Sequence, residues 1–152
     1  MHWRNLKWAR TLPPVDDTVI EEVEEFLGIK FPNDYRECAK VCHGGTPSPG
    51  EFVVYSLGLV KFASCLGYLC SLNKGDPQGI LNTALMLEDV LPNGLVPFAG
   101  DGGGDLICFR YTEQSLPPSI VYYQHELSND EAIVHLADTF TDFVNLLEGG
   151  SK

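Results

Sequence analysis

The chain has 152 residues, of which 44% are hydrophobic and 20% are charged, and its formal net charge at pH 7 is −11. This length and composition predict one soluble globular domain that buries roughly 68–70% of the surface of the unfolded chain, and they exclude a disordered or fibrous protein. The acidic excess argues against nucleic acid and anionic membranes as ligands, because binding them depends on lysine and arginine. The negative charge favours a cationic protein as the partner. The same charge is also explained if it serves only to keep the protein soluble.

No apolar run approaches the roughly 20 residues that cross a bilayer, and the first residues lack the apolar core of a signal peptide. We therefore expect a cytoplasmic protein. The cysteines are odd in number, lie within apolar patterns and lack the paired spacing of zinc ligands, so they are predicted to be buried free thiols in a reducing compartment. They are Cys38, Cys42, Cys65, Cys70 and Cys108.

Residues 1–17 form a predicted N-terminal arm, followed by one domain over residues 18–148 and a short tail over 149–152. The arm holds both tryptophans, Trp3 and Trp8, among three basic residues, and we expect the tryptophans to pack it against the domain.

The first predicted helix begins at Thr18, which has the spacing of a capping box with Glu21, and it ends at Gly28. Apolar residues recur along one of its faces with helical periodicity: Val19, Ile20, Val23, Phe26 and Leu27. The remaining surface carries four glutamates, Glu21, Glu22, Glu24 and Glu25. Their mutual repulsion favours a solvated acidic surface, with a partner-binding ridge as the second interpretation.

A second helix is predicted to open at Pro32, with Asn33 or Asp34 as its cap. Its apolar face would consist of Tyr35, Cys38, Ala39 and Cys42. Gly44 and Gly45 would stop it, and residues 46–50 are expected to form a loop. His43 fits a polar helix terminus better than a catalytic base.

Residues 51–59 and 61–72 are rich in valine, phenylalanine and tyrosine and are predicted to be strands. A third helix is expected to start with Asp76 as its cap and Pro77 at its first position, and to end before Pro92. The last helix would bury Phe140, Phe143, Val144 and Leu147, and residues 130–137 would extend it or form a separate turn.

The best-specified stretch is Val96–Phe109, in which two apolar runs flank a turn with glycine at positions 100, 102, 103 and 104. It is predicted to be a hairpin, because glycine permits left-handed backbone and close approach in the turn. Residues 119–125 add a third strand, so we expect an antiparallel meander.

The glycines and aspartates of this turn suggest three kinds of ligand: a phosphate, a dinucleotide and calcium. A phosphate loop would need a lysine, and a dinucleotide fingerprint would need a following helix, and neither is present. Calcium stays open because Asp101 and Asp105 are oxygen ligands, although the EF-hand spacing is missing. A plain turn without a ligand is favoured over calcium. A contact between the backbone of the turn and a partner protein also stays open. No cofactor motif, metal motif or catalytic motif is found in the chain, so we expect no enzyme, no cofactor and no metal.

Several segments together resemble one known family. Phe31–Tyr35 with Gly44 and Gly45, then Val96–Cys108, then Ile120–Tyr123 and Thr139–Phe143 resemble the SUKH superfamily in their order and spacing. More narrowly, they are similar to its Smi/Knr branch of cell-wall regulators and bacterial immunity proteins. The resemblance covers roughly residues 18–148. Its motif residues are Pro32, Tyr35, Gly44, Gly45, Pro97, Gly102, Gly103 and Gly104.

The resemblance implies a single α+β domain with a mainly antiparallel β-sheet flanked by helices. It also implies a non-catalytic immunity protein that binds and neutralises a toxin, often a cationic nuclease, and the acidic composition agrees with such a partner. The hypothesis places the contacts on exposed carboxylates, namely Glu21, Glu22, Glu24, Glu25, Asp101 and Asp105. A regulatory scaffold for an endogenous cytoplasmic protein is the alternative, and an enzyme that uses His43 or His125 in a cleft is the third possibility.

Overall fold

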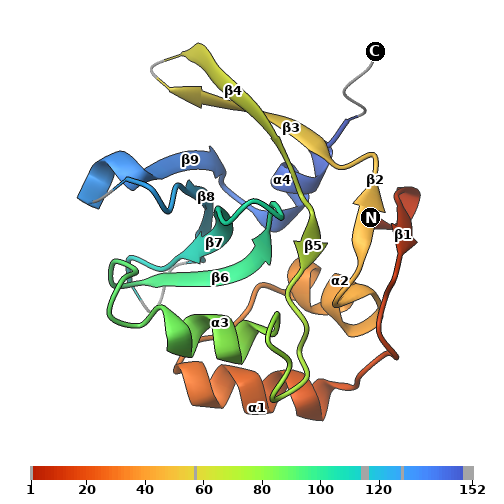
Figure 1. Ribbon diagram of the computed structural model, residues 1–152. Helices are drawn as coiled ribbons and strands as arrows, with labels where there is room; N and C mark the ends of the chain where they lie inside the picture. Colours follow the sequence, from red (N-terminus) through yellow and green to blue (C-terminus); the bar gives the residue numbers. More distant parts are fainter. Residues whose placement is uncertain (1, 57, 114–116, 128, 149–152) are drawn as a thin grey trace.

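The computed structural model describes residues 2–56, 58–113, 117–127 and 129–148 (Figure 1). Within them, the α-helices are Asp17–Leu27 (α1), Asn33–Cys42 (α2), Ile80–Met86 (α3) and Phe140–Asn145 (α4), and the 3-10 helices are His2–Asn5 (η1) and Asn129–Ala132 (η2). The strands are Lys7–Ala9 (β1), Thr46–Ser48 (β2), Glu51–Ser56 (β3), Leu59–Cys65 (β4), Tyr68–Leu69 (β5), Leu95–Gly100 (β6), Leu106–Arg110 (β7), Ser119–Tyr123 (β8) and Ile133–Ala137 (β9).

A five-stranded antiparallel sheet in the order β5-β6-β7-β8-β9 forms the centre of the fold. The hairpin β3–β4 projects from the body, and β1 pairs with β2 in a separate two-stranded ribbon (Figure 1). The helices α1 and α3 run alongside each other below the sheet in this view. The predicted α+β fold with an antiparallel sheet flanked by helices is confirmed.

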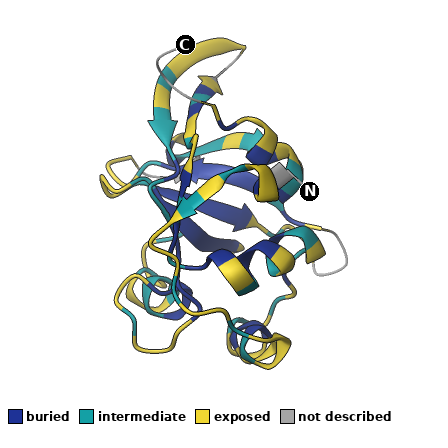
Figure 2. Cartoon of the chain, turned by 90° about the vertical axis from the view of Figure 1, so that its right-hand side faces the viewer, coloured by how far each residue is buried: buried dark blue, intermediate teal, exposed yellow. Residues whose placement is uncertain are grey.

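Alternating residues of the sheet bury two different faces, as the period of two in a β-strand requires. Ile107 and Phe109 point into the main core, whereas Leu106 and Cys108 belong to a smaller cluster on the other side. Strands β6, β7 and β8 are accordingly buried almost throughout, whereas the edge strand β9 is mostly half-buried. Exposed residues lie on the projecting strand β4, on the outer helix surfaces and on loops (Figure 2).

Tyr35 lies at the centre of an aromatic cluster in the main core. Its ring meets Phe98, Phe109 and Phe140 edge-on at centroid distances of 5.6, 5.0 and 5.5 Å. Phe98 and Phe109 stack at 4.3 Å across strands β6 and β7. Such aromatic pairs contribute about 0.5–1.5 kcal/mol each beyond the area that they bury. This cluster joins α2 and α4 to the sheet and confirms the predicted buried face of α2 and the predicted burial of Phe140.

The start of α1 differs from the prediction. Asp16 is its N-cap and accepts a hydrogen bond from the Val19 amide at 3.3 Å, so the capping box expected at Thr18 is wrong. Aspartate caps as well as threonine does, and the sequence offers both. The end at Gly28 is confirmed, because this glycine has a left-handed φ of 72°.

The start of α2 lacks the predicted side-chain cap. Pro32 is its N-cap residue, and neither Asn33 nor Asp34 caps it. The Asp34 carboxylate instead accepts hydrogen bonds from the amide and hydroxyl of Thr141, at 2.9 and 2.8 Å. It therefore ties the start of α2 to the first turn of α4.

Three other segments also differ from their predicted structure. Residues 46–48, expected as loop, form β2, because β1 of the N-terminal arm supplies a pairing partner. Residues 133–137, expected to be helical or a turn, form β9 at the edge of the sheet. The third helix begins at Ile80 rather than Asp76, whose carboxylate accepts a bond from the Gln78 amide in the preceding turn.

The N-terminal arm is part of the main core. Trp3 is 5% exposed, and the indole Nε1 of Trp8 donates to the Trp3 carbonyl at 2.9 Å. Every helix among the described residues is too short or too polar to cross a bilayer.

Candidate protein-binding site

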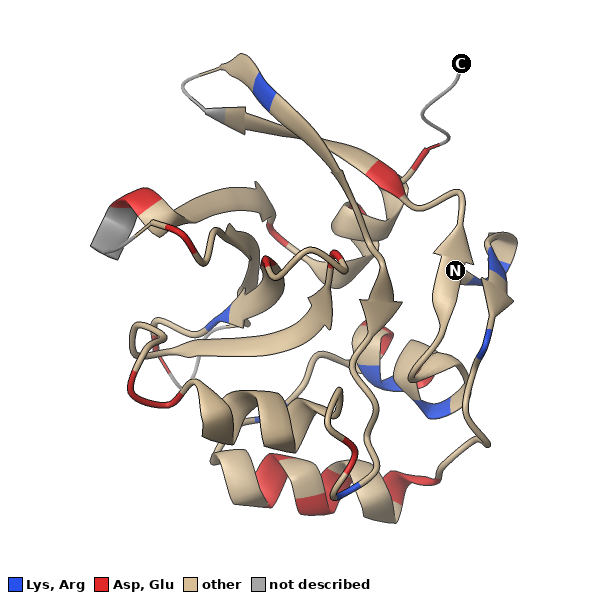
Figure 3. Cartoon of the chain, viewed as in Figure 1, with Lys and Arg blue, Asp and Glu red and all other residues tan. Residues whose placement is uncertain are grey.

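The four glutamates of α1 lie in three different environments. Glu21 and Glu25 are exposed on the side that faces the loop between β7 and β8, and within the described residues neither forms an ion pair. Glu22 is exposed on the side that faces α3, where it lies 3.7 Å from Lys74. Glu24 is buried, so the expectation that it is an exposed contact residue is wrong. Figure 3 shows acidic residues along α1, whereas Lys and Arg are scattered over α2, the N-terminal arm, β4, β7 and loops.

Glu24 is 2% exposed and has a structural role. Its Oε1 lies 2.7 Å from the Arg36 guanidinium, and its Oε2 accepts a hydrogen bond from the Phe31 amide at 2.7 Å. The helical period could have located it, because position 24 follows the buried Ile20 by one turn. Its carboxylate holds the segment 28–32 between α1 and α2.

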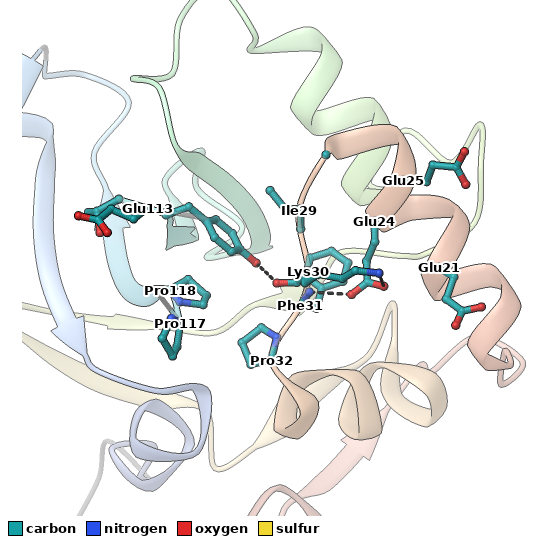
Figure 4. Close-up of a pocket in the computed structure, with 13 residues that line it drawn as sticks. Glu21, Glu24, Glu25, Ile29, Lys30, Phe31, Pro32, Glu113, Pro117 and Pro118 are labelled. Atoms are coloured by element: carbon teal, nitrogen blue, oxygen red, sulfur yellow. Dashed lines mark hydrogen bonds and ion pairs between the residues drawn. The ribbon is translucent and has the colours of Figure 1, made fainter. Parts of the chain in front are cut away.

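A groove runs between α1, the segment 28–32 and the β7–β8 loop (Figure 4). Its volume is about 890 Å³. The floor and walls are mostly apolar and are formed by Gly28, Ile29, Phe31, Pro32, Tyr111, Pro117 and Pro118. The Tyr111 hydroxyl donates to the Lys30 carbonyl at 2.7 Å, so the floor is held from the sheet side as well as by Glu24.

The rim of this groove is acidic. Glu21 and Glu25 stand on the α1 side and Glu113 on the opposite side (Figure 4). Including the buried Glu24, four carboxylates line the groove against one ammonium group, that of the exposed Lys30. The sequence does not indicate Glu113, because only tertiary packing brings this residue opposite α1.

The carboxylates of the glycine-rich turn lie elsewhere, at the other end of β7. Asp101 Oδ1 accepts hydrogen bonds from the amides of Gly103 and Asp105, at 2.7 and 3.2 Å. The buried Tyr122 hydroxyl lies 2.9 Å from Asp101 Oδ2 and 3.0 Å from Asp105 Oδ2. Both aspartates are half-buried and bonded within the turn, so they do not share a surface with Glu21 and Glu25.

His125, in the turn after β8, closes the glycine-rich turn. Its Nδ1 lies 2.6 Å from Asp105 Oδ1, and its backbone amide donates to the same oxygen at 2.9 Å. The hydrogen bond with Asp105 raises the pKa of His125. Burial alone would raise the pKa of the Asp105 carboxyl. The hydrogen bonds from His125 and Tyr122 outweigh burial, and the pKa of Asp105 is lowered. This geometry supports the interpretation of the loop as a structural turn.

His43 is unavailable as a catalytic base because it is fully buried. Its Nδ1 accepts from the Leu72 amide at 3.1 Å, so Nε2 carries the proton and donates to the Pro13 carbonyl at 2.8 Å. His43 is the C-cap residue of α2, so the expectation of a polar helix terminus is confirmed, and its ring is in addition buried and hydrogen-bonded at both nitrogens.

The thiols are unpaired, and all but Cys65 are buried. Burial raises the pKa of Cys70 to about 12, which keeps its thiol protonated. Across the ranges that the structure describes, no three metal-ligating side chains gather into a group that would hold a metal ion.

The sequence matches the model of the SMI1 / KNR4 family (SUKH-1) over residues 14–146. The chain belongs to this family. The resemblance that the segments around Pro32, Gly44 and the glycine-rich turn indicated is thereby confirmed. No curated protein matches the chain. Proteins of the SUKH family act as immunity or regulatory proteins and generally catalyse no reaction.

Within this SUKH-1 chain, the motif residues form the scaffold rather than the groove. Tyr35 centres the aromatic cluster, and Pro97 lies where the register of β6 against β7 shifts, so its missing amide is tolerated. A Cβ on Gly44 would lie 2.8 Å from the Leu12 side chain. Pro32 alone of the motif residues lines the groove.

Proposed function

We propose that this SUKH-1 protein is an immunity protein that binds the cationic domain of a cognate toxin, a nuclease, and neutralises it by covering its active site. The observation that carries the proposal is the apolar groove whose rim holds Glu21, Glu25 and Glu113 without ion pairs to described residues. Family membership supports a protein partner, and the net charge of −11 supports a cationic one.

Two physical effects would hold the toxin on this protein: attraction between opposite charges, and removal of the apolar groove from water. A nuclease binds a polyanion, so the surface around its active site is cationic. Opposite charges accelerate encounter between the two proteins, and an apolar groove provides area to bury once they meet. This function requires no catalytic group.

Co-expression tests the proposal. Where the gene beside this one encodes a toxin, cells that produce that toxin should survive when this chain is co-expressed, and the purified proteins should form a complex whose affinity falls as salt is raised. A histidine variant, His125→Ala, should protect as well as the wild type does. Loss of protection in a folded His125→Ala protein that still binds the toxin would favour the enzyme hypothesis instead.

The regulatory alternative predicts a different outcome of the same experiment. A scaffold for an endogenous partner would neither protect against the toxin nor bind its isolated domain. Absence of both effects overturns the immunity proposal.

A further inference from the structure

The apolar faces of α1 and α3 continue beyond the part of each helix that the domain covers. On α1, Val23 is fully buried, whereas Phe26, on the same helical face, is 60% exposed. On α3, Leu81 is buried, but Leu85, one turn later, is exposed, and its neighbour Met86 is 75% exposed. Both helices therefore end in large apolar side chains that contact water.

These exposed ends flank one recess. Helices α1 and α3 run alongside each other, and the recess between them has a volume of about 340 Å³ (Figure 1). Phe26 lines it from α1, and Leu81 and Leu85 line it from α3. Its polar part contains Glu22 and Lys74, which lie 3.7 Å apart. Exposed apolar surface with a polar rim is typical of protein-binding sites.

The charges around this recess are acidic, apart from that of Lys74. Neither α1 nor α3 contains lysine or arginine (Figure 3). Glu88 and Asp89 are exposed in the turn directly after α3, and the Glu88 amide donates to the Leu85 carbonyl at 3.4 Å. Neither carboxylate forms an ion pair with any part of the chain that the structure describes. The arrangement favours an occupant that is both apolar and cationic.

The same charges disfavour two other occupants. If the recess packed on a second copy of itself, Glu88 and Asp89 of both copies would meet, and each chain has a net charge of −11. An anionic membrane surface repels the same carboxylates. A segment of another protein that carries lysine or arginine beside its apolar side chains satisfies both parts of the surface.

A helix fits the recess better than an extended segment does. The lining residues recur at i and i+4 on both walls, Glu22 with Phe26 on α1 and Leu81 with Leu85 on α3. Such rows form ridges, between which a third helix packs rows of its own. A helix also satisfies its own backbone hydrogen bonds, whereas the peptide groups of an extended segment would meet these side chains instead of a strand edge.

We infer that the recess between α1 and α3 binds a cationic amphipathic helix of a partner protein. The apolar face of that helix packs on Phe26, Leu85 and Met86, and its lysine or arginine residues face Glu88 and Asp89. The inference rests on the proposed function only for the identity of the partner as a toxin. The recess lies on the α3 side of α1, apart from the groove that carries the proposed function.

An amphipathic peptide tests this inference without the toxin. The probe is the blocked peptide Lys-Leu-Ala-Lys-Leu-Leu-Lys-Lys-Leu-Ala-Lys-Leu-Leu-Lys, titrated into the isotope-labelled protein and followed by NMR. We expect saturable shifts of the amides of residues 22–26 and 81–89. A peptide of the same composition with its leucines scattered around the helix should bind at least about tenfold more weakly, and so should one with glutamate in place of lysine.

Serine variants test the apolar contact. Phe26→Ser, Met86→Ser should weaken peptide binding at least about tenfold, because it removes two apolar side chains that the peptide would cover. Both side chains are mostly exposed, so the variant should melt with the wild type. The control Leu59→Ser, Val60→Ser removes comparably exposed apolar side chains from the β3–β4 hairpin, at the opposite end of the molecule, and should have little effect (Figure 1).

Neutral variants test the charges at the end of α3. Glu88→Gln, Asp89→Asn should weaken binding of the lysine peptide about fivefold, since it removes two exposed carboxylates that face the peptide. The control Glu126→Gln, Glu131→Gln makes the same charge change in the turns between β8 and β9 and should have little effect.

Several results would overturn the inference. These are no saturable shift up to about 1 mM peptide, shifts centred on residues 111–113, equal binding of the scattered peptide, and equal weakening by both serine variants. Two other occupants would also overturn it. One is a second copy, shown by a wild-type dimer in analytical ultracentrifugation that Phe26→Ser, Met86→Ser abolishes. The other is a membrane, shown by binding to phosphatidylcholine–phosphatidylglycerol vesicles that the same variant loses.

The toxin separates this inference from the proposed function. Protection by the wild type, together with no peptide binding, overturns the recess and leaves the immunity function standing. Failure of protection by the wild type, with the peptide bound between α1 and α3, overturns the immunity function and leaves the recess.

Discussion

Replacing Glu24 with glutamine removes one buried negative charge while leaving nearly the same atoms in place. Glu24 is 2% exposed and lies 2.7 Å from both the Arg36 guanidinium and the Phe31 amide nitrogen. A hydrogen bond to a charged group contributes about 1.5–3 kcal/mol, and breaking a fully buried ion pair costs about 3–5 kcal/mol. The Arg36 side chain is 18% exposed and regains some water, which places the loss for Glu24→Gln near the lower range, about 2 kcal/mol.

Glu24→Ala should be more damaging, because it also leaves the buried Phe31 amide without an acceptor. We expect a loss of about 3–4 kcal/mol. For a chain of this length, 1 kcal/mol corresponds to about 2–4 °C in Tm, so the glutamine variant should melt about 4–8 °C lower. Lys30 contributes little to the stability that Glu24 provides, because its ammonium group is exposed and lies 4.0 Å from Glu24 Oε1.

Urea unfolding followed by tryptophan fluorescence measures these losses, with Glu25→Gln as the matched control on the neighbouring, exposed position. The control should stay within about 0.5 kcal/mol of the wild type. Hydrogen exchange gives a local measurement, because the Phe31 amide should lose protection in Glu24→Ala. If Glu24→Gln and Glu25→Gln destabilise equally, the assignment of Glu24 as the anchor of the groove floor is refuted.

The other expectations concern the N-terminal arm and the glycine-rich turn. Trp3→Ala should cost about 3–5 kcal/mol in urea unfolding, because the side chain lies in the main core, and a loss below about 1 kcal/mol would show the arm to be dispensable. NMR titration should place the pKa of His125 above 6.5, and Asp105→Asn should return it toward that value. The folded-state pKa of His125 is raised and that of Asp105 is lowered, so the pair stabilises the fold while His125 is protonated and Asp105 is ionised; the stabilisation disappears as the pH rises through the folded-state pKa of His125 and as it falls through that of Asp105. Gly104→Ala should lower the same pKa, since its Cβ would lie 2.8 Å from His125 Cε1, whereas a Cβ on Gly102 meets nothing within 4 Å and Gly102→Ala should leave it unchanged.

Local patterns in the sequence were sufficient for much of the fold. The apolar face of α2, the end of α1 at Gly28 and the β6–β7 hairpin each depend on neighbours in sequence, and each was predicted. Strands β2 and β9 were not, because their conformation is decided by partners distant in the chain, β1 and β8. The last helix was expected to end at Gly149 and Gly150, which lie outside the described residues, but α4 ends earlier, at Asn145, with Leu146 as its C-cap.

The candidate site was predictable only in part, for the same physical reason. The sequence identified the acidic face of α1, and Glu21 and Glu25 do line the groove. It did not reveal that Asp101 and Asp105 turn inward to Tyr122 and His125, because those contacts join separate strands. Nor did it place Glu113 opposite α1.

The affinity of the purified chain for the cognate toxin domain, measured by calorimetry over a series of salt concentrations, tests the central claim most directly. We expect a complex that weakens steadily as salt increases and that is lost in Glu25→Lys, Glu113→Lys but retained in Glu126→Lys, Glu131→Lys. An affinity that salt leaves unchanged, or no complex at all, would contradict the claim that this acidic groove captures a cationic toxin.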